Sequence, residues 1–192
     1  PLYGPDRRVA AEKADPKRYN PHCNDCVLGE GPKSPCLGPL VTSRPAGQTL
    51  LVITDWPTAV EDDRGAFMNS TNSWVRKVVE PLWEGSIVYT HGIRCAVSRS
   101  EKDEPPDAAF TACRGYLRST LDAVRPARIL IIGKTAGIAL LDRAVHAPWV
   151  RGGYAYLASG AVAYWMPEPS RAITNDLYGR DWLEDARHAL QD

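Results

Sequence analysis

Short runs of hydrophobic residues alternate with longer amphipathic segments over most of the chain. Four of the runs are rich in β-branched and other apolar residues and are bounded by turn residues, as buried strands are. These runs are residues 49–54, 86–90, 128–132 and 160–165. Helical periodicity occupies residues 72–82, 107–124, 133–141 and 181–190. Strands alternating with helices predict an α/β three-layer sandwich with a central, mostly parallel four-stranded sheet.

The first 47 residues lack this pattern. They contain half of the 16 prolines in the chain, a density that prevents long helices and central strands. A length of 192 residues suits one hydrophobic core. We therefore expect a single domain, in which an irregular, proline- and glycine-rich segment (1–47) wraps over an α/β body (48–192).

Charge and composition narrow the class of protein. The 23 Lys and Arg balance the 23 Asp and Glu, which excludes nucleic-acid binding through bulk positive charge but leaves room for a small cationic face. Hydrophobic residues make up 44% of the chain, so wholesale disorder is excluded. No apolar stretch approaches the roughly 20 residues of a membrane span, and the N-terminal residues are too polar for a signal peptide. We expect an intracellular, cytoplasmic protein with no membrane partner.

The common nucleotide and hydrolase motifs are missing from the sequence. Gly133-Lys134-Thr135 follows a hydrophobic run, but the glycine that a phosphate-binding loop needs five residues earlier is Arg128. The backbone cradle for a nucleoside triphosphate cannot form within a strand, so a tight strand-to-helix turn is the better interpretation. The motifs H-E-x-x-H, G-x-S-x-G and G-x-G-x-x-G do not occur.

Five cysteines are the unusual feature of the composition. In a reducing compartment they indicate a metal, cluster or catalytic role rather than disulfides. The pair Cys23 and Cys26 has the spacing of a chelating C-x-x-C, and Cys95 and Cys113 can complete a set of four. The wide spacing of the second pair favours an iron–sulfur cluster over zinc, and buried thiols without a metal are the third interpretation. Cys36 is either a thiol outside the ligand set or an alternative ligand.

In parallel α/β sheets, ligands bind beyond the carboxyl ends of the strands. Those ends lead here to Asp55, His91, Gly133 and Met166. We therefore look for function in these four loops.

The order of these segments resembles the uracil-DNA glycosylase superfamily, most closely its iron–sulfur branch, family 4. After the C-x-x-C come residues 54–67 (TDWPTAVEDDRGAF), 91–95 (HGIRC), 112–117 (ACRGYL), 125–136 (RPARILIIGKTA) and 165–170 (WMPEPS). The resemblance extends over roughly residues 20–190. It implies a 4Fe–4S cluster on Cys23, Cys26, Cys95 and Cys113, with zinc as the alternative.

The resemblance also suggests roles for the strand-end residues. Asp55 stands where the family has a catalytic Glu, and His91 stands where it has the Asn that reads uracil. Phe67 matches the aromatic residue that stacks on the flipped base, on the loop that contains Glu61, Asp62 and Gly65. Either Met166 or Glu168 takes the place of the last-motif His. The predicted catalytic residues are Asp55, His91 and Glu168, and the predicted base-binding residues are Trp56, Phe67, His91 and Met166.

The implied activity is hydrolysis of the N-glycosidic bond of a base flipped out of DNA, by a protein that acts as a monomer. Ser170 and Arg171 are predicted to contact DNA phosphates, within a cationic face around Arg94, Arg114 and Arg171. Because the pocket residues differ from the family pattern, we expect specificity for a modified or deaminated base rather than plain uracil. The alternatives are a catalytically weak base-sensing protein and an enzyme that processes a modified base.

Overall fold

The computed structural model describes residues 18–20, 23–29, 36–44, 47–64, 67–97, 104–141 and 153–191. Side chains are described in the same ranges except 18–20 and 62–64. Gly65, the side chain of Asp62 and most of the prolines of the predicted N-terminal wrap lie outside these residues.

The described residues form a mixed α/β fold around a six-stranded sheet with the order β3-β5-β4-β6-β8-β7. Its strands are β3 (Leu40–Thr42), β4 (Leu50–Thr54), β5 (Ile87–His91), β6 (Arg128–Ile132), β7 (Tyr154–Tyr156) and β8 (Val162–Met166). The four central strands are parallel, and their register places Thr54 beside His91 and Ile132 beside Met166. The two edge strands are antiparallel to their neighbours.

The prediction of four strands identified the four parallel ones and missed both edges. Strands β3 and β7 have three residues each, too few for period-2 alternation to stand out. Strand β3 also lies within the segment expected to wrap irregularly, so part of residues 1–47 belongs to the sheet. A separate two-stranded sheet joins β1 (Arg18–Asn20) to β2 (Cys36–Leu37).

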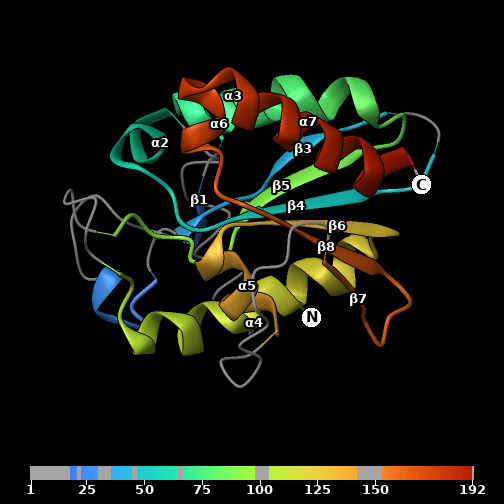
Figure 1. The fold of residues 1–192 in the computed structure, drawn as a ribbon. Coiled ribbons are helices and arrows are strands. Elements are labelled where there is room, and N and C mark those ends of the chain that lie inside the picture. The colour runs from blue at the N-terminus through green and yellow to red at the C-terminus, as the bar shows by residue number, and fades with distance from the viewer. Residues whose placement is uncertain are drawn as a thin grey trace.

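Helices cover both faces of the main sheet (Figure 1). On one face lie α3 (Ser70–Val79), α6 (Ser170–Thr174) and α7 (Asp176–Gln191), and on the other lie α4 (Asp107–Val124) and α5 (Lys134–Leu141). The short helix α2 (Ala59–Arg64) follows β4, and 3-10 turns occupy Val27–Gly29 and Glu80–Leu82. The three-layer prediction is confirmed, although α2 and α6 were not foreseen and α7 begins before the predicted residue 181.

Strand β4 shows how the core is divided. All five of its residues are buried, because helices cover both faces of this central strand. Leu50 and Val52 contribute to the core beneath α3 and α7, whereas Leu51 and Ile53 pack with α4 and α5. Successive side chains along β4 thus pack alternately into the two hydrophobic layers, one on each face of the sheet.

The loops that carry the predicted site gather at one edge of the sheet. Helices α2, α5 and α6 follow the carboxyl ends of β4, β6 and β8, and α2 and α6 lie at the left of Figure 1. Trp182 of α7, almost fully buried, donates a hydrogen bond from Nε1 to the Pro167 carbonyl at 3.0 Å. This bond ties the loop after β8 to the helical layer.

Among the described residues, the helices are too short or too polar to cross a membrane.

Candidate active site at the carboxyl edge of the sheet

Asp55 follows β4 directly and turns its carboxylate toward the start of α5. Its Oδ1 accepts a hydrogen bond from the Ala136 N–H at 2.8 Å, which satisfies a backbone donor that the first turn of a helix leaves unpaired. Its own carbonyl accepts from the Ile93 N–H at 3.0 Å. Asp55 therefore connects three of the four strand-end loops.

Burial is the main influence on the Asp55 carboxyl. It raises the pKa of Asp55 to about 6, against the lowering effect of the Ala136 N–H, and the negative charge of Glu168 adds to the rise. A carboxyl group with this pKa is mostly ionised at neutral pH and becomes protonated in mild acid. Such a shift is typical of acids that take part in chemistry.

Gly133 makes room for this carboxylate. Its backbone has φ of 97°, and a Cβ at this position would lie 2.4 Å from Asp55 Oδ2 and 2.5 Å from Oδ1. A side chain would therefore be strained at this φ and would also displace Asp55. The sequence interpretation of Gly133 as a tight strand-to-helix turn is confirmed. The close approach of Asp55 is a second reason why this position requires glycine.

His91 lies deeper in the edge, at the end of β5. Its ring stacks on Phe67, with centroids 4.9 Å apart and planes inclined by 25°, and Nδ1 lies 2.8 Å from Thr54 Oγ1. Phe67 also contacts Tyr89 and has a left-handed backbone, with φ of 60°. His91 is 1% exposed and Phe67 is 0% exposed, so Phe67 presents no exposed face on which a base could stack.

Glu61 organises the residues around His91. It is fully buried, and its Oε2 accepts from the Thr58 N–H at 3.0 Å and from Asn69 Nδ2 at 2.7 Å. Its Oε1 accepts from Asn72 Nδ2 at 2.8 Å and lies 3.8 Å from His91 Nε2. Several donors thus compensate the burial of one carboxylate.

The buried imidazole is neutral at physiological pH. Burial lowers the pKa of His91 to about 4, Glu61 opposes this effect, and the positive charge of Arg94 adds to it. His91 Nε2 has no hydrogen-bond partner among the described residues. The Nε2 atom faces the Glu61 carboxylate, but at 3.8 Å from Oε1 it is too far away for a hydrogen bond.

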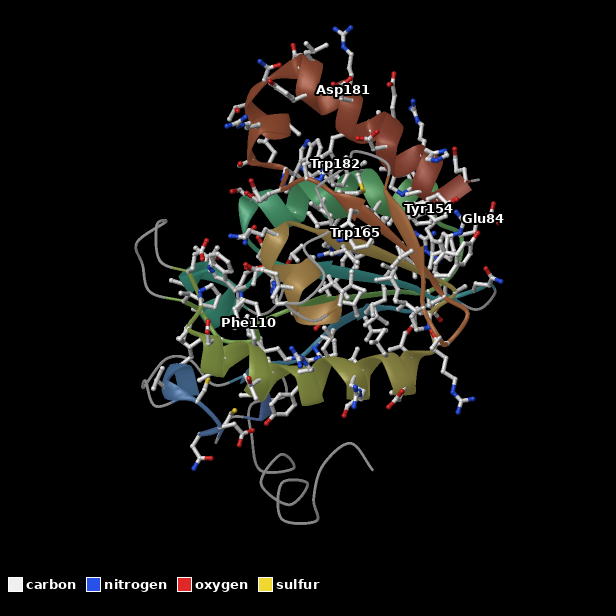
Figure 2. The ribbon with its side chains drawn as sticks, turned by 60° about the horizontal axis from the view of Figure 1, so that its bottom comes forward. Glu84, Phe110, Tyr154, Trp165, Asp181 and Trp182 are labelled. Carbon is white, nitrogen blue, oxygen red and sulfur yellow. The ribbon has the colours of Figure 1, made fainter. Side chains whose placement is uncertain are left out.

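A pocket of about 670 Å³ opens between the ends of β6 and β8 and the helices α6 and α7; its lining includes Gly133 but not Asp55. Its volume lies in the range of small-molecule sites. Figure 2 shows Trp182 directed from α7 toward the sheet and Asp181 on the outer part of the same helix. The lining consists of Gly133, Lys134, Trp165, Met166, Pro167, Glu168, Arg171, Ala172, Tyr178, Asp181, Trp182 and Asp185.

The predicted site residues therefore fall into separate groups. Met166, Glu168 and Arg171 line the pocket, and Ser170 begins α6 beside it, donating its N–H to Glu168 Oε2 at 3.0 Å. His91 and Phe67 form the closed stack. Trp56 is half-buried and packs with the core on the α4 and α5 side of the sheet.

Cysteines from four segments that are far apart in the sequence lie on the α4 side of the molecule. Cys23, Cys36 and Tyr116 form one buried cluster, and Tyr116 Oη lies 3.7 Å from Cys23 Sγ. Burial raises the pKa of Cys95, and the thiols of Cys36, Cys113, Cys23 and Cys26 raise it further, in that order of strength. Burial also raises the pKa of Cys113 to about 11.

Burial and the positive charge of Arg94 act on the Cys113 thiol in opposite directions. The thiols are mostly buried, and the Arg94 guanidinium and backbone N–H both oppose the rise in the Cys113 pKa, because they favour its thiolate. In the part of the chain that the structure describes, no three His, Cys, Asp or Glu side chains are arranged around a single metal ion.

The predicted cationic face is wrong for Arg94. This residue is 1% exposed, donates from Nη2 to Thr120 Oγ1 at 2.6 Å and lies over the Tyr116 ring. Arg94 follows directly after the turn that ends β5, and its side chain packs inward beside the cysteines. The positive charge of Arg94 therefore acts on the buried Cys113 thiol. Of the three arginines expected to form the cationic face, Arg171 is the one that lines the pocket.

Several functional positions escaped the sequence analysis. The role of Glu61 at the centre of a buried network was not foreseen, nor were its donors Asn69 and Asn72. The available signal was Asn69 as a helix N-cap before α3, since its side chain accepts from the Asn72 N–H. The pocket-lining face of α7, with Tyr178 and Trp182, had no sequence signal beyond helical periodicity.

The family model described as "Uracil DNA glycosylase superfamily" matches residues 41–191, most of the chain and all of the main sheet apart from the first residue of β3. A search of curated proteins finds no match.

Gly133→Ala tests the close contact with Asp55. We expect the free energy of unfolding to fall by more than about 1 kcal/mol, because the new Cβ meets the carboxylate at an unfavourable φ. Gly115→Ala is the matched control, since nothing lies within 4 Å of its Cβ position in α4; it should stabilise the protein by about 0.5–1 kcal/mol. Urea unfolding measures both, and a Gly133→Ala variant as stable as the wild type contradicts the contact.

Proposed function

Because the chain belongs to the uracil DNA glycosylase superfamily, we propose that it binds a base flipped out of DNA and hydrolyses its N-glycosidic bond. Members of this superfamily are typically DNA glycosylases. The observation that supports this role is the partly buried Asp55 carboxylate at the carboxyl edge of the sheet, which packs against Gly133, a residue that lines the pocket.

The reaction requires stabilisation of opposite charges. As the bond between the sugar C1′ and the base nitrogen breaks, positive charge grows on the sugar and the base leaves with the electron pair. Water then bonds to C1′ and releases a proton, and the departing base is protonated. Ionised Asp55 can stabilise the sugar cation or orient the water. Glu168 lies near enough to raise the Asp55 pKa, and it lines the pocket itself.

The Phe67–His91 stack supports an altered base specificity. A base could lie against Phe67 only if His91 moved, and both rings are buried. The pocket beside Met166 offers space without such a movement. We therefore propose that the base enters on the Met166 side and that the substrate is a modified or deaminated base rather than plain uracil. In this arrangement His91 is a positioning residue.

The surface around α6 and α7 supports a contact with DNA. Arg171 provides a cation that can bind a phosphate. Ile173, Leu177 and Tyr178 are exposed nearby, an unusual grouping of apolar side chains on a surface. Apolar side chains can wedge between bases and help to unstack them. We propose that this part of the two helices faces the DNA.

We further propose a 4Fe–4S cluster held by Cys23, Cys26, Cys95 and Cys113, with zinc as the alternative. The support is the gathering of buried thiols beside Arg94, whose positive charge offsets that of thiolates. Such a cluster would anchor the segment containing Cys23 and Cys26 to α4. Its chemistry here is structural, since the cysteines do not line the pocket.

Oligonucleotides that contain uracil, hypoxanthine, xanthine or a 5-substituted uracil test the proposed activity. We expect cleavage of at least one modified or deaminated base faster than of plain uracil, detected as alkali-labile abasic sites. Asp55→Asn should abolish this cleavage, with Glu168→Gln as a comparison at the second carboxylate. If the protein cleaves none of these substrates but binds DNA tightly and in a salt-sensitive manner, the base-sensing alternative replaces the proposal.

The pH dependence of cleavage tests the state of Asp55. Because the proposed mechanism needs the ionised form and burial raises the Asp55 pKa to about 6, activity should be full above this pH and fall as the pH drops through it. A profile that stays flat down to about pH 4, the ordinary range of an aspartate, contradicts the assignment.

Iron analysis and visible absorbance test the cofactor. We expect a brown protein that contains iron, and Cys23→Ala should remove both the iron and the colour. A colourless protein that contains zinc supports the alternative metal and contradicts the cluster.

A further inference from the structure

Strand β7 presents two tyrosines to solvent at one edge of the main sheet. Tyr154 is 55% exposed and Tyr156 is 74% exposed, and their ring centroids lie 5.8 Å apart in an edge-to-face arrangement. Both side chains project from the same face, because the two residues are two apart along a strand. Exposed aromatic side chains that are grouped in this way are a sign of an interaction site.

The row of tyrosines continues inward across the sheet. Tyr164 of β8 lies directly opposite Tyr154, and their ring centroids are 5.8 Å apart. Tyr164 in turn lies beside His188 of α7, with centroids 6.4 Å apart. We call Tyr154, Tyr156 and Tyr164 the tyrosine stripe. It extends from the edge of the sheet to the last turns of α7.

A cation lies against the tyrosine stripe. The Arg128 guanidinium lies over the Tyr164 ring, with Cζ 5.9 Å from the ring centroid. Its Nη1 donates to the Ala189 carbonyl at 2.6 Å, and the side chain makes no other hydrogen bond to the described residues. Arg128 is half-buried, so its remaining N–H groups can reach a ligand. Phosphate oxygens suit such a group of donors.

The tyrosine stripe borders the pocket proposed for the flipped base. On β8, Tyr164 lies two residues before Met166, which lines the pocket, so the two side chains share a face about 7 Å apart along the strand. On α7, His188 follows the pocket residue Asp185 by about one turn. Along α7, the pocket therefore lies between the surface around Leu177 and the tyrosine stripe.

We propose that the tyrosine stripe binds the nucleotides next to the flipped base, with unpaired bases stacked on Tyr154 and Tyr156 and a phosphate on Arg128. This inference rests on the proposed function and names the form of DNA that the site accepts. Only unpaired bases expose their faces for stacking, so the stripe selects single-stranded DNA over a duplex. The cation and the continuity with the pocket favour nucleic acid over a protein partner.

Fluorescence anisotropy of labelled oligothymidylate, single-stranded or paired with oligodeoxyadenylate, tests the tyrosine stripe. We expect the wild type to bind the single strand more tightly than the duplex. Y154A/Y156A should weaken single-strand binding at least about tenfold and duplex binding less than about threefold, because only the single strand loses stacked bases. Y154F/Y156F keeps both rings and should bind like the wild type. V41A is the matched control, since Val41 is exposed on the opposite edge strand, and both affinities should be unchanged.

The possible failures can be told apart. Single-strand binding that is unchanged in Y154A/Y156A, or weakened equally with duplex binding, overturns the role of the stripe, and base excision by the same protein leaves the proposed function intact. Loss of single-strand binding in this variant, when the wild type excises no base, supports the stripe and contradicts the proposed activity.

Two further outcomes are decisive. A wild-type dimer that Y154A/Y156A dissociates, without a change in DNA affinity, makes the stripe a protein interface and overturns the proposal. If Y154A/Y156A does not fold, Y156A gives the same comparison at the more exposed ring.

Discussion

The carboxylate of Glu61 is fully buried, and its need for hydrogen-bond donors determines the arrangement of the candidate site. Its donors come from Thr58 at the start of α2 and from Asn69 and Asn72 at the start of α3. These bonds join the start of α2 to the start of α3, on either side of Phe67 in the sequence. Phe67 is thereby held over His91 with a left-handed backbone that few non-glycine residues adopt. The buried Glu61 carboxylate thus helps to hold in place the residues that close the inner side of the site.

The open side depends on a different set of contacts. Asp55 caps α5 across Gly133, and Trp182 holds the loop after β8 through the Pro167 carbonyl. The pocket lies between these two contacts, and its lining includes Gly133, the residue that the Asp55 carboxylate packs against. The resemblance suggested a single base-binding site that contains Phe67, His91 and Met166. In the structure, Phe67 and His91 form the buried inner stack, whereas Met166 lines the outer pocket. This division is the structural reason for proposing a base other than uracil.

The sequence predicted those parts of the fold that depend on long periodic patterns. The four parallel strands and α4 were identified because buried strands are continuously apolar and the helix is amphipathic over 18 residues. Edge strands of three residues leave no such pattern. Asp55, Gly133 and Met166 were found from a general rule about strand ends. The Phe67–His91 stack and the burial of Arg94 were not predictable, because they depend on side-chain directions set by tertiary packing.

His91 is enclosed beneath Phe67 as a neutral imidazole, and NMR titration of histidine-labelled protein tests this state most directly. The chain has four histidines, and comparison with His91→Asn assigns the signal. The structure predicts that His91 remains neutral through physiological pH and becomes protonated only near pH 4. A midpoint near the ordinary value of 6.5 would mean that solvent reaches the ring, and it would contradict a closed inner site.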